Sequence, residues 1–376
     1  MQKFKSTFIC TIYIVILMVM VSCKDTERVL TSATGTIYEC LVVMNNESLT
    51  QEELEAVAKK SSEEEYSEFS QDISTTYGLV ETIMGAEMPC MPQPESYFKL
   101  THVTMSMFDN VLKPTRNILI VDINPKKYTK VTTKVNSDVW STPQAVCHIQ
   151  APSQQEFVNY WLEKGEWVRD WFVNQELSRQ GSFYRSGYNQ DARNILQEQK
   201  YDMLIPNDYM VIKDTIVEVK ANDSNNKAEK VQVLWCCNNK GSTRRDVFVY
   251  SYPYIDENTF TLEFLNARRD AVLSQLVTGS VEGSYMGTEY NIMPPQMRTI
   301  NVQNNATAYE IRGLWKLKEG EAMGGPYVSH TRLDKTNSRI VTTETFLFAP
   351  GQKKRNPYRQ AEAILYTLTL PEDNVK

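Results

Sequence analysis

The chain has 376 residues, with 40 lysines and arginines against 46 aspartates and glutamates, and a formal net charge of −6. An acidic balance without a long basic run argues against nucleic-acid binding, which depends on Lys and Arg side chains that neutralise phosphates. The length allows one large core or two modest domains, and the apolar and charged fractions are those of an ordinary globular protein.

The N-terminus has the pattern of a bacterial secretion signal. Lys3 and Lys5 form a short basic start, and residues 8–21 are almost wholly apolar. This run is too short for a comfortable membrane span, which needs about 20 apolar residues, but it fits the apolar region of a signal peptide. It ends in Met-Val-Ser-Cys at residues 20–23, which resembles the lipobox that precedes an acylated cysteine.

We therefore predict a signal peptide over residues 1–22, lipidation at Cys23 and a polar, flexible tether over 23–34. An acylated cysteine would attach the protein to a membrane, since each buried methylene contributes about 0.8 kcal/mol. The expected location is the outer membrane, on its periplasmic face or at the cell surface. An uncleaved N-terminal anchor, with Cys23 as an incidental thiol, is the alternative. Removal of residues 1–22 takes two lysines and no acid, which leaves 38 basic and 46 acidic residues.

Five cysteines remain in the mature chain, and their spacing matches no common metal site. An oxidising envelope permits disulfides, but four of the five lie in apolar, strand-like runs, so we predict buried free thiols. The adjacent pair would point to opposite faces of a strand, and a disulfide between them would be strained. The five are Cys40, Cys90, Cys147, Cys236 and Cys237.

In the first half, the sequence predicts helices, an extended loop and four strands. Thr50 and Glu53 have capping-box spacing and open a helix, and the acid-rich residues 61–68 continue it as a solvated face. Three prolines in residues 88–95 predict an extended loop. A second capping box at Ser153 opens a long helix with an aromatic-rich apolar side, and residues 181–200 continue as helix or linker. Strands are expected at 37–44, 97–105, 117–123 and 144–150.

The second half contains more strand-like runs. One helix is expected at about 261–277, and a closing helix begins at Asn356-Pro357, with Asn356 as the N-cap. Strands cluster instead of alternating strictly with helices, which favours an α+β fold. We predict two similar halves, 35–200 and 201–376, each an antiparallel-rich sheet packed by a long amphipathic helix. The strands are expected at 210–213, 231–237, 246–252, 297–302, 309–317, 327–333 and 339–348.

Several motifs resemble one lipoprotein family of Bacteroidota, domain-of-unknown-function family 4837. In the second half they are SYPYIDENTF (251–260), NARRDAVL (266–273), VEGSYMGTE (281–289), RGLWKL (312–317), MGGPYVSHTRLD (323–334) and residues 346–368. In the first half they are MPQPE (91–95), RNILIVDI (116–123) and WSTPQAV (140–146). The sequence departs from the family where Cys236 and Cys237 follow Trp235 in place of basic residues. The resemblance implies location, origin and a shared fold, and it implies no catalytic residue.

Common catalytic signatures are missing from the sequence. There are three histidines and no HExxH, GxSxG, GxxxxGK[ST] or GxGxxG motif, so we predict no metal site and no cofactor. This favours a non-catalytic binding or assembly component of the envelope, with a membrane as the one implied partner and the protein or glycan partner unknown. The alternatives are a hydrolase that acts on envelope or imported glycan, with two carboxylates in a cleft, and a solute-capturing lipoprotein with a hinge.

The strongest local pattern lies between residues 312 and 330. It combines Arg312, Trp315, Tyr327 and His330 with a Gly-Gly-Pro turn. A functional interpretation is a binding site where glycines let the backbone approach a ligand and aromatic rings offer a flat surface. The simpler interpretation is a loop between two strands with its aromatics in the core. Basic residues 353–355, before the last helix, offer a weaker candidate for anion binding.

Overall fold

The structure is a computed structural model that describes residues 29–63, 73–220, 228–302 and 306–374. It has the predicted α+β class, with two main sheets and helices packed on both. The signal-like segment, Cys23 and the acid-rich residues 64–68 lie outside the described ranges. Among the described residues, no helix is both long enough and apolar enough to span a membrane.

The first sheet has five strands in the order β3-β2-β4-β7-β5, and only β5 runs antiparallel to its neighbour. The prediction of an antiparallel-rich sheet in this half was wrong. Long connections separate β2, β3 and β4, and crossovers of this kind produce parallel pairing, in which strands are continuous apolar runs. The strands are β2 (Glu39–Val43), β3 (Lys99–Val103), β4 (Asn117–Ile123), β5 (Thr132–Ser137) and β7 (Ala145–Ala151).

Three helices lie together on one side of this sheet: α2 (Gln51–Glu63), α3 (Thr76–Met84) and α4 (Gln154–Tyr184). The capping box of α2 is confirmed, because the Thr50 amide donates to Glu53 Oε2 at 2.8 Å and the Glu53 amide donates to Thr50 Oγ1 at 3.3 Å. Ser153 caps α4 as expected. Four of the apolar residues predicted for the long helix are buried, namely Phe157, Trp161, Val168 and Phe172, whereas Trp167, predicted for the same apolar band, is 49% exposed.

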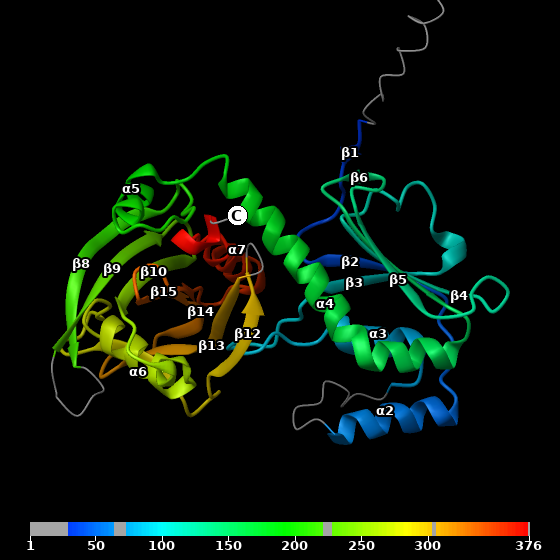
Figure 1. The fold of residues 1–376 in the computed structure, drawn as a ribbon. Helices are drawn as coiled ribbons and strands as arrows, with labels where there is room; N and C mark the ends of the chain where they lie inside the picture. The colour runs from blue at the N-terminus through cyan, green and yellow to red at the C-terminus, as the bar shows by residue number, and fades with distance from the viewer. Residues whose placement is uncertain (1–28, 64–72, 221–227, 303–305, 375–376) are drawn as a thin grey trace, which may run out of the picture.

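The opposite face of the first sheet is covered chiefly by loops. A short 3-10 helix, η1 (Met105–Met107), and the turn after it pack there with Trp140. At the same corner, β1 (Thr31–Ser32) pairs in parallel with β6 (Ser141–Thr142). Residues 31–32 thus form a strand within the segment expected to be a tether, and both strands lie at the end of the molecule from which the described chain starts (Figure 1).

The second sheet has eight strands and is antiparallel throughout, in the order β11-β13-β14-β15-β10-β9-β8, with β12 also paired to β13. It differs from the first sheet in size and strand direction, so the predicted similarity of the halves was wrong. The strands are β8 (Met210–Lys220), β9 (Ala228–Asn238), β10 (Arg244–Pro253), β11 (Tyr285–Glu289), β12 (Gln296–Asn301), β13 (Thr307–Lys318), β14 (Gly324–Asp334) and β15 (Arg339–Phe348).

Two helices cover opposite faces of the second sheet. α6 (Leu262–Leu273) lies on one face and α7 (Arg355–Leu365) on the other, and each packs over a separate apolar cluster. α5 (Gln190–Glu198) contacts β8 and β9. Two further 3-10 helices, η2 (Glu257–Phe260) and η4 (Pro371–Asn374), lie before α6 and after α7.

The two halves share one apolar core, which includes residues of β2, β4, β7, α4, β10, β15 and α7. Tyr184, the last residue of α4, donates to the Gln360 carbonyl of α7 at 2.6 Å. Glu95, from the proline-rich loop, accepts the Lys354 and Arg355 amides at 2.6 and 2.9 Å. α7 therefore begins at Arg355, with Lys354 as N-cap, and the prediction of Asn356 as N-cap was wrong: a carboxylate distant in sequence satisfies the helix start.

The predicted state of the cysteines is confirmed. All five described cysteines are free and buried, and four of them lie on strands: Cys40 on β2, Cys147 on β7, and Cys236 and Cys237 on β9. Burial raises the pKa of the Cys40 thiol above its ordinary value and that of the Cys147 thiol to about 12. These thiols are small apolar side chains in the core.

Candidate functional site

The four candidate residues lie on two neighbouring strands but on two faces of the sheet. Arg312 and Trp315 lie on β13, and Tyr327 and His330 lie on β14. Because side chains alternate along a strand, Arg312 and His330 point toward α7, whereas Trp315 and Tyr327 belong to the apolar cluster under α6. The structure therefore separates the four into two pairs.

The Gly-Gly pair of this segment is part of a strand. Gly324 and Gly325 begin β14 and pair with β13. A Cβ atom on Gly325 would lie 2.1 Å from the Leu347 carbonyl oxygen, and Trp315 Nε1 donates to that same oxygen at 3.2 Å. The glycine thus permits close approach of β14 to β15, and the aromatic ring beside it packs in the core.

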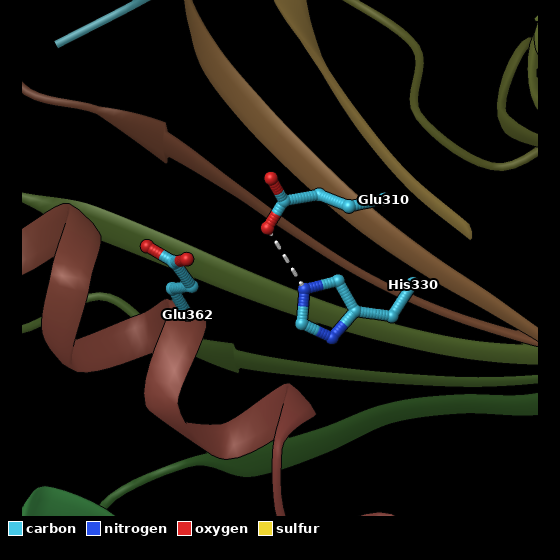
Figure 2. Close-up of side chains that lie close together, drawn as sticks. All are labelled: Glu310, His330 and Glu362. Carbon is cyan, nitrogen blue, oxygen red and sulfur yellow. Dashed lines mark hydrogen bonds and ion pairs between the residues drawn. The ribbon is translucent and has the colours of Figure 1, made fainter. Parts of the chain in front are cut away.

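The first pair belongs to a charge cluster, which we call the α7-face cluster: Arg298, Glu310, Arg312, His330, Arg359 and Glu362. All of these residues are buried except Arg298, whose side chain is 47% exposed. Glu310 accepts from Arg298 Nε at 2.7 Å, from Arg312 at 2.8 and 2.9 Å, and from His330 Nε2 at 3.3 Å. Glu362 projects from α7 toward the same point (Figure 2). It accepts from Arg312, and from Arg359 at 2.8 and 3.1 Å.

Both carboxylates of this cluster are fully buried and ionised. Burial opposes ionisation of Glu310, but Arg312, His330 and Arg298 outweigh it and hold the pKa of Glu310 well below its usual value. Burial is likewise outweighed at Glu362, where Arg312 and Arg359 lower the pKa. Buried carboxylates that are paired and hydrogen-bonded in this way belong to networks that join structural elements.

The cluster also contains three potential metal ligands, since donor atoms of Glu310, His330 and Glu362 all lie within 4.8 Å of one another. The oxygens already accept from three guanidinium groups, and the His330 nitrogen that faces Glu310 is engaged with it. A divalent cation would have to displace Arg312 from between the two carboxylates. This set of side chains therefore fits arginine and does not fit a metal ion.

Tyr327, from the second pair, belongs to another cluster, the α6-face cluster: Arg269, Asp270, Thr288, Tyr327 and Glu344. All of these residues are buried except Asp270, which is half-buried. Arg269 Nε lies 2.9 Å from both oxygens of Glu344, and Arg269 Nη1 donates to Thr288 at 3.0 Å. The guanidinium carbon lies 3.8 Å from the centre of the Tyr327 ring. Burial raises the pKa of Glu344 above its ordinary value, because one arginine does not fully offset the loss of water.

A surface cavity of about 480 Å³ lies where the halves meet near the start of α7. Its lining includes Glu95, Lys99, Lys353 and Arg355. The basic segment 353–355 was the weaker anion-binding candidate. The carboxylate of Glu95 accepts the backbone amides at the start of α7. Lys354 Nζ donates hydrogen bonds to Gln93 Oε1 and to the Gln352 carbonyl.

Residues 189–367 match the family model described as Domain of unknown function (DUF4837). Residues 74–185 match a second model, described as Domain of unknown function (DUF8532). No curated protein matches the chain. The DUF4837 match covers α5 to α7, and thus both charge clusters. The first-half motifs at 91–95, 116–123 and 140–146 fall within the DUF8532 match.

Sequence reasoning missed the charged residues of the DUF4837 region that complete both clusters. Glu310 and Arg312 stand two apart in an apolar strand, a spacing that puts both on one face. Arg359 and Glu362 stand three apart on the buried side of α7, where charged residues are rare. These spacings mark buried ion pairs, but the partners of Arg269 lie 19 and 75 positions along the chain and leave no local pattern.

Proposed function

We propose that this protein is a lipid-anchored, non-catalytic component of the bacterial cell envelope, attached to the outer membrane through Cys23. The N-terminal pattern of basic start, apolar run and Ser-Cys junction supports the anchor. The resemblance to a lipoprotein family of Bacteroidota points the same way.

One observation supports the proposal that the protein is non-catalytic. The side chains of the described residues that best resemble a reactive constellation, Glu310, His330 and Glu362, are buried and neutralised by arginines. Their arrangement binds α7 to the sheet, and both carboxylates already accept hydrogen bonds from buried arginines. The function then resides in a surface that a rigid body presents near the membrane.

Two observations bear on the alternative functions. Glycan hydrolysis needs two carboxylates that reach a substrate, but Arg312 stands between the closely spaced Glu310 and Glu362. Solute capture by domain closure needs a hinge between the halves, whereas the core and α4 run continuously from one half to the other. Both observations favour a binding or assembly role.

The test is to extract the full-length protein from membranes in mild detergent and to measure the mass of the native particle. We expect a particle heavier than the monomer that contains a second envelope component. A Cys23→Ala variant should leave the membrane fraction. A monomer that cleaves envelope glycan, with activity lost in the Glu310→Gln variant at unchanged stability, would replace this proposal with the hydrolase.

A further inference from the structure

The described chain starts at a corner of the first half that is held by backbone pairing. β1 pairs with β6, the Ala33 amide donates to the Thr142 carbonyl at 3.0 Å, and the Thr34 amide donates to the Pro114 carbonyl at 2.9 Å. Ser141 Oγ donates to the same Pro114 carbonyl at 2.9 Å. The start of the described chain is therefore fixed beside Trp140 and the turn that ends at Pro114.

The distance from this corner to Cys23 is limited by covalent geometry. Val29 is six residues after Cys23. Because a residue spans at most about 3.6 Å, the two Cα atoms lie no more than about 22 Å apart. If Cys23 is acylated, as the proposed function requires, Val29 lies within that distance of the bilayer surface, and Thr31, where β1 begins, lies within about 29 Å of it.

Apolar side chains of the turn after η1 and of Trp140 lie at the same corner, and we call them the corner patch: Met107, Phe108, Val111 and Trp140. Val111 and Met107 are 79% and 62% exposed. The rings of Phe108 and Trp140 are half-buried and pack edge to face, with centroids 5.7 Å apart. A contiguous group of exposed apolar side chains marks a surface that contacts a partner protein or a membrane.

The backbone of this corner is well satisfied, so the patch has a defined shape. Asp109 Oδ1 accepts the amides of Val111 and Leu112 at 2.9 and 3.3 Å, and Gln144 Nε2 donates to the Lys113 and Thr115 carbonyls at 2.6 and 2.7 Å. The helices α2, α3 and α4 pack on the other face of the sheet. Met107 and Val111 are thus held outward by a satisfied turn.

We propose that the corner patch rests on the surface of the phospholipid bilayer that holds the acyl chains of Cys23. The short reach from Cys23 selects this occupant over a soluble partner. Trp and Phe side chains are favoured at the headgroup level, and Met and Val contribute by burial of apolar area. The chain is acidic and Asp109 lies within the patch, so attachment is apolar in origin and does not require anionic lipid.

The experiment uses full-length, lipidated protein in phosphatidylethanolamine vesicles with brominated acyl chains, which quench nearby fluorophores. One fluorophore is attached through Met107→Cys or Val111→Cys, and in the control through Ile216→Cys. Ile216 is also apolar and exposed, but it lies on β8, at the far side of the molecule (Figure 1). The native cysteines of the described chain are buried, so the introduced thiol is labelled selectively.

We expect several-fold stronger quenching at positions 107 and 111 than at 216, unchanged when the protein is diluted in the bilayer. Intact mass of each sample separates the two proposals. Acylated protein with equal quenching at all three positions overturns the docking surface and leaves the anchor standing. Unmodified Cys23 overturns both. Energy transfer between labels on two copies, lost on dilution, would assign the patch to a second copy and overturn its contact with lipid.

Discussion

The two faces of the second sheet both contain buried carboxylates, but they neutralise them in different ways. The α7-face cluster distributes two carboxylates among three arginines and a histidine, from β12, β13, β14 and α7. The α6-face cluster relies on one arginine and one carboxylate, Arg269 and Glu344, with Asp270 and Thr288 at the edge. The pKa values reflect this, since those of Glu310 and Glu362 are lowered and that of Glu344 is raised.

The clusters also differ in what they hold together. The α7-face cluster touches the first half, because Arg359 lies over the rings of Tyr38 and Tyr97 and the Cys90 thiol donates to the Arg312 carbonyl at 3.3 Å. The α6-face cluster lies wholly within residues 262–348. The α7-face cluster therefore joins the two halves, whereas the α6-face cluster stabilises the second sheet alone.

The largest effect is expected from Glu362→Gln. This change leaves Arg359 buried without a carboxylate and Arg312 with Glu310 alone, so we expect the free energy of unfolding to fall by about 3–5 kcal/mol. Urea unfolding followed by circular dichroism measures it. The exposed Glu282→Gln is the matched control and should change little. A loss below 1 kcal/mol at Glu362 would show that the cluster does not hold α7.

A smaller effect is expected from Glu344→Gln. The amide oxygen of the new glutamine still accepts from Arg269, and Arg269 keeps its contacts with Asp270 and with the Tyr327 ring. We therefore expect the free energy of unfolding to fall by about 1–3 kcal/mol. The exposed Glu263→Gln on α6 is the control. Hydrogen exchange should locate the weakening in the second sheet, with the first sheet unchanged. Equal weakening of both sheets would contradict the distinction between the clusters.

The two faces should respond to pH in opposite directions. Glu310 and Glu362 have lowered pKa values, so the unfolded chain takes up protons first, and stability is lost as pH falls below 4.5. Glu344 has a raised pKa, so the unfolded chain loses its proton first, and its contribution falls as pH rises above 4.5.

Each group changes the slope by at most about 1.4 kcal/mol per pH unit. Unfolding midpoints measured from about pH 3 to pH 7 check this. In a plot of stability against pH, Glu310→Gln should make the curve flatter below pH 4.5, and Glu344→Gln should make it flatter above pH 4.5. The same effect from both variants would rule out the assignment of opposite shifts.

The smallest effect is expected at the link between the first half and α7. Glu95→Ala removes the acceptor for the first two amides of α7, and we expect a loss of about 1 kcal/mol. Glu87→Ala, a change at the exposed residue just before the proline-rich loop, is the control. Faster exchange of the α7 amides in Glu95→Ala alone would confirm the cap, and unchanged exchange would contradict it.

Much of the local structure could be predicted from the sequence, because its determinants are local. The capping box at Thr50 and Glu53, the long helix after Ser153 and the strand over Arg339–Phe348 follow from spacing alone. Strand direction in the first sheet could not be predicted from the sequence, because an apolar run such as Asn117–Ile123 is compatible with parallel and with antiparallel pairing.

The candidate site shows the same limit. Arg312 and His330 were singled out and do lie together, but what decides their role is Glu362, which arrives from a helix 50 positions away from Arg312. Trp315 and Tyr327 were grouped with them because they are close in sequence, whereas alternation along the strand places them on the other face. Chemistry assembled by tertiary structure leaves few marks in the sequence.

The most direct test of the lipid-anchored account is the intact mass of the protein extracted from its own membranes. We predict a chain that begins at Cys23 and carries the added mass of two or three acyl chains with glycerol. A chain that retains residues 1–22 with an unmodified Cys23 would contradict the anchor, and with it the placement of the corner patch on the bilayer.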